Sequence, residues 1–174
     1  MISIKTKRLT INNFTSVDWQ GLKEIIISYE QSPYAIYDHQ WPTTDKQLQN
    51  ICAWFAKANE FLAVRLNETL IGYISLNKTE EQGVYNIGYN FNSKYHKKGY
   101  AIESCRAIIN FAFNNLKALK LMTGTAEKNG PSNNLLKQLG FISVGENICS
   151  FRNDTSGKAI EFNAINYELK NISK

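Results

Sequence analysis

The sequence has 174 residues, of which 43% are hydrophobic and 20% charged, and its formal net charge is +5. These values are typical of an ordinary soluble globular protein, most simply a single domain over residues 1–174. No apolar run approaches the ~20 residues that span a bilayer, so we expect a cytoplasmic protein with no membrane partner.

Alternating and helical hydrophobic patterns predict elements in the order β-α-α-β-β-β-α-β-α-β-β. We expect strands at residues 3–14, 61–66, 70–77, 84–91, 119–126, 141–151 and 160–169. We expect helices from a cap at residues 16–18 to about 29, from residues 42–45 to about 57, from near residue 99 onward, and over 131–139. The pattern shows no internal repeat or linker, which favours one domain.

The third predicted helix carries one continuous apolar stripe, because its hydrophobic residues recur at spacings of three and four. These residues are Ile102, Cys105, Ile109, Ala112, Phe113 and Leu116. The three cysteines, Cys52, Cys105 and Cys149, lie far apart in apolar surroundings without a nearby ligand at metal spacing. They therefore indicate buried thiols, with neither a disulfide framework nor a bound metal.

A basic glycine turn connects the strand at 84–91 to the third helix. Tyr85, Ile87, Tyr89 and Phe91 fall on one face of that strand, as period-two alternation requires. A helix that starts near Gly99 presents unpaired N–H groups and the positive end of its dipole to the turn, and glycine allows a bulky group to approach. The turn, which also carries Lys94, Lys97 and Lys98, is either a phosphate site or a solvated lysine turn.

Three segments resemble one family, the GNAT superfamily of N-acetyltransferases. HKKGYA, residues 96–101, resembles its Q/R-x-x-G-x-G/A signature, with His96 in place of the usual Gln or Arg. NGPSNNLLKQLGF, residues 129–141, resembles the later family motif, and TKRLTI, residues 6–11, is similar to the first strand of the ribosomal-protein N-terminal acetyltransferase branch. The resemblance covers essentially the whole chain.

The resemblance implies a GNAT α/β fold, a mixed sheet with helices on both faces, and acetyl-CoA as co-substrate. In that family, the strand before the turn parts from its neighbour and its backbone pairs with the pantetheine arm, which implies that Tyr89, Asn90 and Phe91 supply those groups. The residues implied around the diphosphate are His96, Lys97, Lys98, Gly99, Tyr100, Ala101 and Ile102, and Asn129 is expected to contact the coenzyme.

The implied reaction is direct attack of a primary amine on the thioester in a ternary complex. The leaving sulfur needs a hydroxyl, and some family members place a Tyr seven residues after the motif Asn, where this chain has Leu136. The nearest hydroxyl is Ser132, which is either the catalytic acid or a residue of the first helical turn.

The amine side shows no obvious carboxylate base, because Gly124 and Asn86 stand where relatives have acids. This mildly favours an α-amine or another low-pKa amine over a lysine. His39, in the loop between the first two helices, is a candidate base or a packing residue. Tyr34, Tyr37 and Trp41 form an acceptor wall or anchor that loop, and Glu103 suits the first turn of its helix.

Three functions remain open from sequence. The first is acetyl transfer to a protein N-terminus or a small-molecule amine, by a monomer or homodimer. The second is a non-catalytic acyl-CoA sensor, which the missing Tyr and acid allow. The third is a basic nucleic-acid-binding domain, although the twenty basic residues are interspersed with fifteen acidic ones and no base-reading motif is present, so no specific nucleic-acid partner is expected.

Overall fold

A computed structural model describes residues 2–172 of the chain as one mixed sheet covered by helices. The strands are β1 (Ser3–Lys5), β2 (Leu9–Asn13), β3 (Phe61–Leu66), β4 (Thr69–Lys78), β5 (Val84–Phe91), β6 (Lys120–Ala126), β7 (Ile142–Asn153) and β8 (Ala159–Lys170). The helices are α1 (Trp19–Glu30), α2 (Asp45–Ala58), α3 (Tyr100–Asn114) and α4 (Gly130–Gln138), with short 3-10 turns η1 (Ser16–Asp18), η2 (Ala35–Tyr37) and η3 (Ser93–Tyr95).

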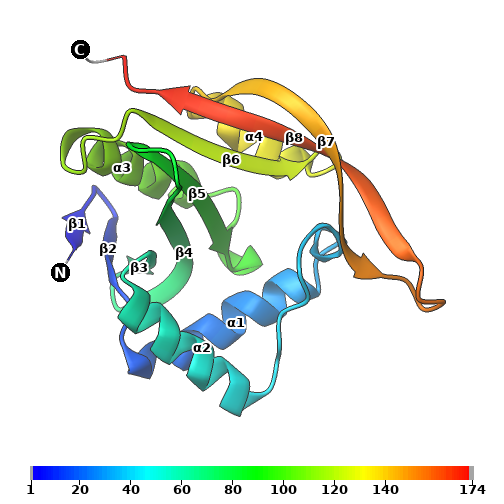
Figure 1. Cartoon of the computed structure of the whole chain (residues 1–174). Coiled ribbons are helices and arrows are strands. Elements are labelled where there is room, and N and C mark those ends of the chain that lie inside the picture. Colours follow the sequence, from blue (N-terminus) through cyan, green and yellow to red (C-terminus); the bar gives the residue numbers. More distant parts are fainter. Residues whose placement is uncertain (1, 173–174) are drawn as a thin grey trace.

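The sheet has eight strands in the order β1-β2-β3-β4-β5-β6-β8-β7 (Figure 1). Every neighbouring pair is antiparallel except β5 with β6, which runs parallel. This parallel pair joins the segment β1–β5 to the segment β6–β8–β7, and α3 makes the crossover that a parallel connection requires. The predicted mixed sheet with helices on both faces is confirmed.

Strand alternation divides the buried side chains into two cores, one on each face of the sheet. Leu62 and Val64 of β3 join α3 and α4 residues in one core, whereas Phe61 and Ala63 join α1 and α2 residues in the other. The helices therefore cover opposite faces, α1 and α2 on one and α3 and α4 on the other (Figure 1). No helix in residues 2–172 is long and apolar enough to cross a membrane.

The first predicted strand, residues 3–14, is wrong as a single element, so the predicted element order lacks one strand. Thr6 turns the chain there, because its N–H donates to the Leu9 carbonyl at 2.9 Å and its hydroxyl accepts from the Leu9 N–H at 3.0 Å. Residues on either side of this turn pair with each other as β1 and β2. The hydrophobic alternation is the same in one strand or two, so the pattern could not show the turn.

Two burial predictions also need correction. Leu116 was placed in the apolar stripe of α3, but the helix ends at Asn114 and Leu116 is 38% exposed. Cys52 and Cys105 are buried thiols, as predicted, and burial raises their pKa to about 11 and about 12. Cys149 is only half-buried, because it lies on the edge strand β7.

The aromatic residues of the core beneath α1 and α2 predict where substitutions destabilise the fold most. Phe55 is fully buried and stacks on Phe61 with ring centroids 3.7 Å apart, whereas its neighbour Trp54 is 53% exposed. We expect Phe55→Ala to lower the free energy of unfolding by about 3–5 kcal/mol and Trp54→Ala by about 1 kcal/mol. Urea unfolding measures both, and equal losses would contradict this assignment of the core.

Candidate active site

The parallel strands β5 and β6 pair over only three residues and then diverge. Their register runs from Val84↔Lys120 to Asn86↔Met122 and stops there. Beyond this point β5 stays paired to β4 as far as Phe91, and β6 stays paired to β8 as far as Ala126. The sheet therefore opens between the second half of β5 and the second half of β6 (Figure 1).

The backbone of β5 presents alternate residues to this opening. The N–H of Asn92 donates to the Ile71 carbonyl on β4 at 3.0 Å, so even-numbered residues direct their backbone groups to β4. The N–H and C=O groups of Ile87, Tyr89 and Phe91 consequently face away from β4, toward the opening. The predicted backbone contact by Asn90 is the exception, because its main chain belongs to the β4 side.

The turn after β5 brings the start of α3 to the mouth of the opening. Gly99 is the N-cap of α3 and has φ of +80°, a left-handed conformation that favours glycine. A Cβ at this position would lie 3.2 Å from the Arg8 guanidinium, and apart from its chain neighbours no other heavy atom of the described residues would lie within 4 Å. The next amides, at residues 100–102, have no acceptor within the helix, since every α-helix begins with unpaired N–H groups. The local geometry is that of an anion site.

Most side chains of the turn are already engaged within the turn itself. The His96 ring lies 2.8 Å from the Phe91 carbonyl, and the Lys98 ammonium donates to the Lys94 carbonyl at 3.1 Å. Lys94 pairs loosely with Glu24, at 3.7 Å. Lys97 adopts a left-handed backbone, with φ of +58°, and is exposed. The backbone amides are thus the groups that this turn offers most directly to a ligand.

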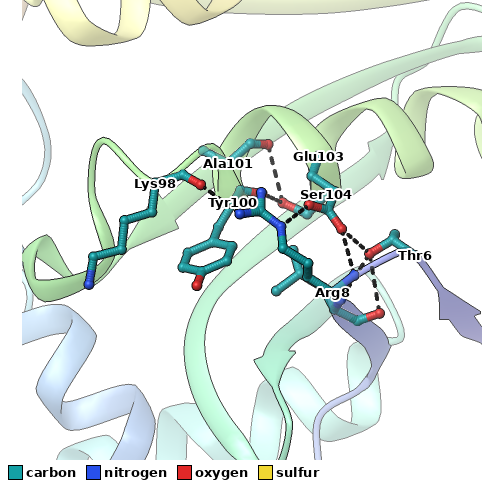
Figure 2. A network of polar contacts seen from close by, with 8 residues as sticks. Thr6, Arg8, Lys98, Tyr100, Ala101, Glu103 and Ser104 are labelled. Atoms are coloured by element: carbon teal, nitrogen blue, oxygen red, sulfur yellow. Dashed lines mark hydrogen bonds and ion pairs between the residues drawn. The ribbon is translucent and has the colours of Figure 1, made fainter.

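A brace from the turn between β1 and β2 holds the start of α3 in place, as Figure 2 shows. The Arg8 guanidinium donates to Glu103 Oε2 at 2.7 Å and to the Lys98 carbonyl at 2.9 Å, and lies 4.5 Å from the Tyr100 ring centroid. The Arg8 N–H and the Thr6 hydroxyl both donate to Glu103 Oε1, at 2.9 and 2.6 Å. Because a trans peptide points its C=O and N–H in opposite directions, the hydrogen bond from Arg8 to the Lys98 carbonyl turns the Gly99 N–H away from Arg8.

Sequence analysis missed this role of Arg8. TKRLTI was visible as a strand motif, and Glu103 was expected only to favour the helix N-terminus, but nothing in the sequence pairs positions 95 residues apart. Partial burial alone would raise the pKa of Glu103; the hydrogen bonds from Thr6 and Arg8 outweigh it and hold that pKa below its usual value.

On the other side of the opening, the start of α4 meets β5. Asn129 caps α4 by accepting from the Ser132 N–H at 3.3 Å, and the Ser132 hydroxyl lies 2.9 Å from the Tyr89 hydroxyl. Two residues predicted for different roles are therefore in contact. Burial raises the pKa of Tyr89, so its phenol stays protonated. Leu136, the position at which some relatives carry Tyr, is 1% exposed in the core.

His39 lies against strand β7. It is exposed, and its ring packs against Phe151 with centroids 4.6 Å apart. Arg152 of β7 holds this loop by donating to both carboxylate oxygens of Glu30, at 3.0 and 2.8 Å, and to the carbonyls of Asp38 and His39. The geometry favours the packing interpretation of His39.

The aromatic residues of the same loop contact different parts of the protein. The Tyr37 ring packs against Phe162 with centroids 5.1 Å apart, and the backbone N–H of Trp41 donates to Glu30 at 3.0 Å. Tyr34 accepts a long hydrogen bond, 3.5 Å, from the Tyr29 hydroxyl through its carbonyl. The Trp41 ring also packs against Phe55, with centroids 6.4 Å apart. These contacts fit the loop-anchoring role, and the acceptor wall stays a prediction.

Comparisons with known proteins agree on the family. Residues 8–142 match the family model "Acetyltransferase (GNAT) domain". The chain is 30% identical over 143 residues to the uncharacterized N-acetyltransferase YnaD of Bacillus subtilis, an alignment that covers 82% of this chain and 84% of that protein.

Solved structures agree on the fold. The ribosomal-protein-S5-alanine acetyltransferase of Vibrio fischeri superposes with a TM-score of 0.81 at 17% identity, over 99% of this chain and 98% of that one. RimJ of Mycobacterium smegmatis, solved in complex with CoA-disulfide, superposes with a TM-score of 0.76 at 12% identity, over 95% of this chain and 84% of that one. At these identities the likeness is one of fold.

The brace predicts a pH-dependent contribution to stability. A carboxyl whose folded pKa is lowered stabilises the fold above its unfolded pKa, and this contribution is lost as pH falls through the folded pKa. We expect Glu103→Gln to lower the free energy of unfolding by about 1–2 kcal/mol at pH 7, and the difference to shrink near pH 3. The control is Glu24→Gln, whose exposed pair with Lys94 spans 3.7 Å. Equal stability of the Glu103 variant and wild type at pH 7 would contradict the brace.

Proposed function

Because this chain belongs to the GNAT acetyltransferase family and is an N-acetyltransferase, we propose that it transfers an acetyl group from acetyl-CoA to a primary amine. The observation that carries the proposal is the divergence of β5 from β6 after Asn86↔Met122. This divergence leaves backbone donors and acceptors facing a gap that a strand-like ligand can fill. The pantetheine arm, with its two amide groups, has the chemistry of such a ligand.

The turn beside the opening supports a diphosphate site. The amides of Gly99, Tyr100, Ala101 and Ile102 lie at a helix N-terminus, where the dipole favours negative charge. Lys97 and Lys98 add positive charge, and His96 closes the turn on Phe91. RimJ, which shares this fold, was solved with a CoA derivative bound, which supports the proposed co-substrate. On the far side we propose that Asn129 contacts the coenzyme at the start of α4.

The catalytic proposal follows from the direction of the β5 backbone. A neutral amine attacks the thioester carbonyl, the C–N bond forms, and the C–S bond breaks. The Tyr89 N–H faces the opening, so we assign it the developing oxyanion; a donor of this kind is typically worth ~3 kcal/mol. Ser132 gives its hydroxyl proton to the leaving sulfur, and its hydrogen bond with Tyr89 at 2.9 Å orients it.

The proposed acceptor is a protein N-terminus or a small-molecule amine. The superposable Vibrio fischeri enzyme is named for the alanine of ribosomal protein S5, and another structural neighbour, with a TM-score of 0.76, is named as a spermidine N-acetyltransferase. At pH 7, deprotonating an α-amine costs ~1.4 kcal/mol and a lysine ~4.6 kcal/mol. An α-amine is therefore the easier acceptor for a site with little base catalysis.

A single domain over residues 1–174, a cytoplasmic location and a monomeric or homodimeric state stay predictions. A specific nucleic-acid partner is not part of the proposal, since the positive charge of the turn is accounted for by a diphosphate. His39 is retained only as an untested candidate, because its ring packs on Phe151.

The proposed diphosphate site makes a prediction for Gly99→Glu. Acetyl-CoA at 100 times its Kd should stabilise the wild type by about 2.7 kcal/mol, measured as a rise in Tm. We expect Gly99→Glu to abolish this rise, because the side chain adds bulk and negative charge where the diphosphate binds. Gly157→Glu is the control, since Gly157 also has positive φ (+85°) and open space around it. An unchanged rise in the Gly99 variant would count against the site.

The proposed acid makes a prediction for Ser132→Ala. Free thiol release from acetyl-CoA would be followed with peptide amides that begin with Ser or Ala and with spermidine. With the amine that the wild type accepts, kcat should fall by about 10²-fold, with the Kd of acetyl-CoA unchanged. Ser143→Ala, an exposed serine of β7, is the control. A kcat within twofold of wild type would remove Ser132 from the mechanism, and no release by the wild type with any amine would contradict the function.

A further inference from the structure

The loop between α1 and α2 carries a carboxylate that sequence analysis did not single out, Asp38. Its main chain is fixed by Arg152, which donates from Nε to the Asp38 carbonyl at 2.7 Å and from Nη2 to the His39 carbonyl at 3.1 Å. Arg152 is in turn fixed by its bidentate pair with Glu30. The position of Asp38 is thus set by strand β7 and by the end of α1.

The side chain of Asp38 is poorly compensated for a half-buried charge. Within residues 2–172 the carboxylate accepts one hydrogen bond, from the adjacent His39 N–H at 2.7 Å, and has no ion pair. The nearby guanidinium of Arg152 is committed to Glu30 and to backbone carbonyls. Burial raises the pKa of Asp38 above its usual value and the charge of Glu30 adds to this, against opposing contributions from His39 and Arg152. A buried carboxylate without a counter-cation is costly unless a ligand supplies one.

The end of α1 connects this loop to the opening in the sheet. The Ser28 hydroxyl of α1 lies 2.9 Å from the hydroxyl of Ser93, which follows the end of β5. Tyr73 of β4 is 6% exposed and is the cross-strand partner of Asn90. Burial chiefly raises the pKa of Tyr29 and of Tyr73, and the Asp38 charge raises both further. These electrostatic contributions agree with a carboxylate on this side of β5, and Tyr73 pairs with the diverging part of that strand.

The two faces of β5 carry groups with different roles in proton transfer. Tyr89 points to the α3 and α4 face, where its hydroxyl meets Ser132. Asn90, one residue later, points to the α1 and α2 face, where Tyr73 lies and where Arg152 ties the Asp38 main chain to the end of α1. A proton donor for the sulfur and a proton acceptor for the nitrogen would thus lie on opposite sides of the same strand.

We propose that Asp38 binds the ammonium group of the acceptor and removes the proton that the nitrogen must lose before it attacks. This inference rests on the proposed function and names its acceptor site: a half-buried carboxylate beside the end of α1, selective for a primary ammonium. The proton of R–NH3⁺ passes to the Asp38 carboxylate and then to solvent. The nitrogen forms the C–N bond, the C–S bond breaks, and the second proton lost from nitrogen balances the one that the sulfur gains through Ser132.

If Asp38 had a structural role, replacing it would lower the stability of the fold. Its raised pKa predicts the reverse. A carboxyl whose folded pKa is raised stabilises the fold only when protonated, and this contribution is lost as pH rises through the folded pKa. At pH 7 the ionised Asp38 therefore costs stability in the free protein. Asp38→Asn should leave Tm unchanged or raise it, as expected of a residue retained for function.

The test compares Asp38→Asn with the control Asp45→Asn, the same change at an exposed carboxyl that pairs with Lys23. The probes are a tetrapeptide amide that begins with Ser, and spermidine. With the probe that the wild type acetylates, we expect kcat/KM for the amine to fall about 10²-fold or more in Asp38→Asn. The Kd of acetyl-CoA and the Tm should hold, and Asp45→Asn should match the wild type.

The pH profile supplies a second readout. In the wild type, kcat/KM should fall as pH drops through the raised pKa of Asp38, because the base is then protonated; in Asp38→Asn only the limb due to the acceptor amine should remain. The neighbouring charged and titratable groups are Tyr29, Glu30, His39, Tyr73 and Arg152.

Two outcomes would overturn the inference while leaving the proposed function intact. One is a kcat/KM within threefold of wild type in Asp38→Asn. The other is a loss of activity that comes with a lower Tm and weaker acetyl-CoA binding, which would show a structural role. If the wild type binds acetyl-CoA but acetylates neither probe nor any other primary amine, the proposed function fails and takes this inference with it.

Discussion

The short parallel contact between β5 and β6 is the constraint on which the rest of the site depends. Each of these strands is fully paired on its other side, β5 with β4 and β6 with β8. The two halves of the sheet are therefore stable antiparallel units that meet over three register pairs and can diverge beyond them. At Gly72, where β4 faces the end of β5, a Cβ would lie 2.3 Å from the Phe91 ring. The glycine lets that ring close over β4 and keeps the last residue of β5 in register.

The proposed binding site at this opening depends on a turn that is held in one conformation. Backbone amides at a helix N-terminus attract anions, but their directions depend on each peptide plane. The brace from Thr6 and Arg8 fixes the plane between Lys98 and Gly99 and ties it to Glu103 in the first turn of α3. Because Glu103 neutralises Arg8 locally, the brace orients the turn without placing an unpaired cation beside the expected ligand. Lys97, Lys98 and the helix dipole are then the positive groups that face outward.

The opposite faces of β5 separate the proposed proton donor from the proposed proton acceptor. Successive side chains of a strand alternate between faces, so Tyr89 and Asn90 bring different surroundings to adjacent positions. On one side a buried phenol and a serine hydroxyl can support a leaving thiolate; on the other, a half-buried carboxylate can receive a cation. The loop that carries the carboxylate is distant in sequence but is held by Arg152, so β7 contributes to the acceptor side through its hold on this loop.

The sequence by itself determined the features that depend on neighbours along the chain. The bounds of β3 and β5 and the glycine N-cap of α3 were predictable, because hydrophobic periodicity, capping and backbone conformation act over a few residues. The layout of helices on both faces was implied by the resemblance to the family. The family could be inferred for the same reason, since its motifs lie in such local segments. Only the tertiary structure decided which distant side chains meet. Arg8 reaches Lys98 over 90 positions, Ser132 meets Tyr89 over 43, and Arg152 holds Asp38 over 114. Such contacts depend on how layers pack, so the periodic pattern could not predict the brace.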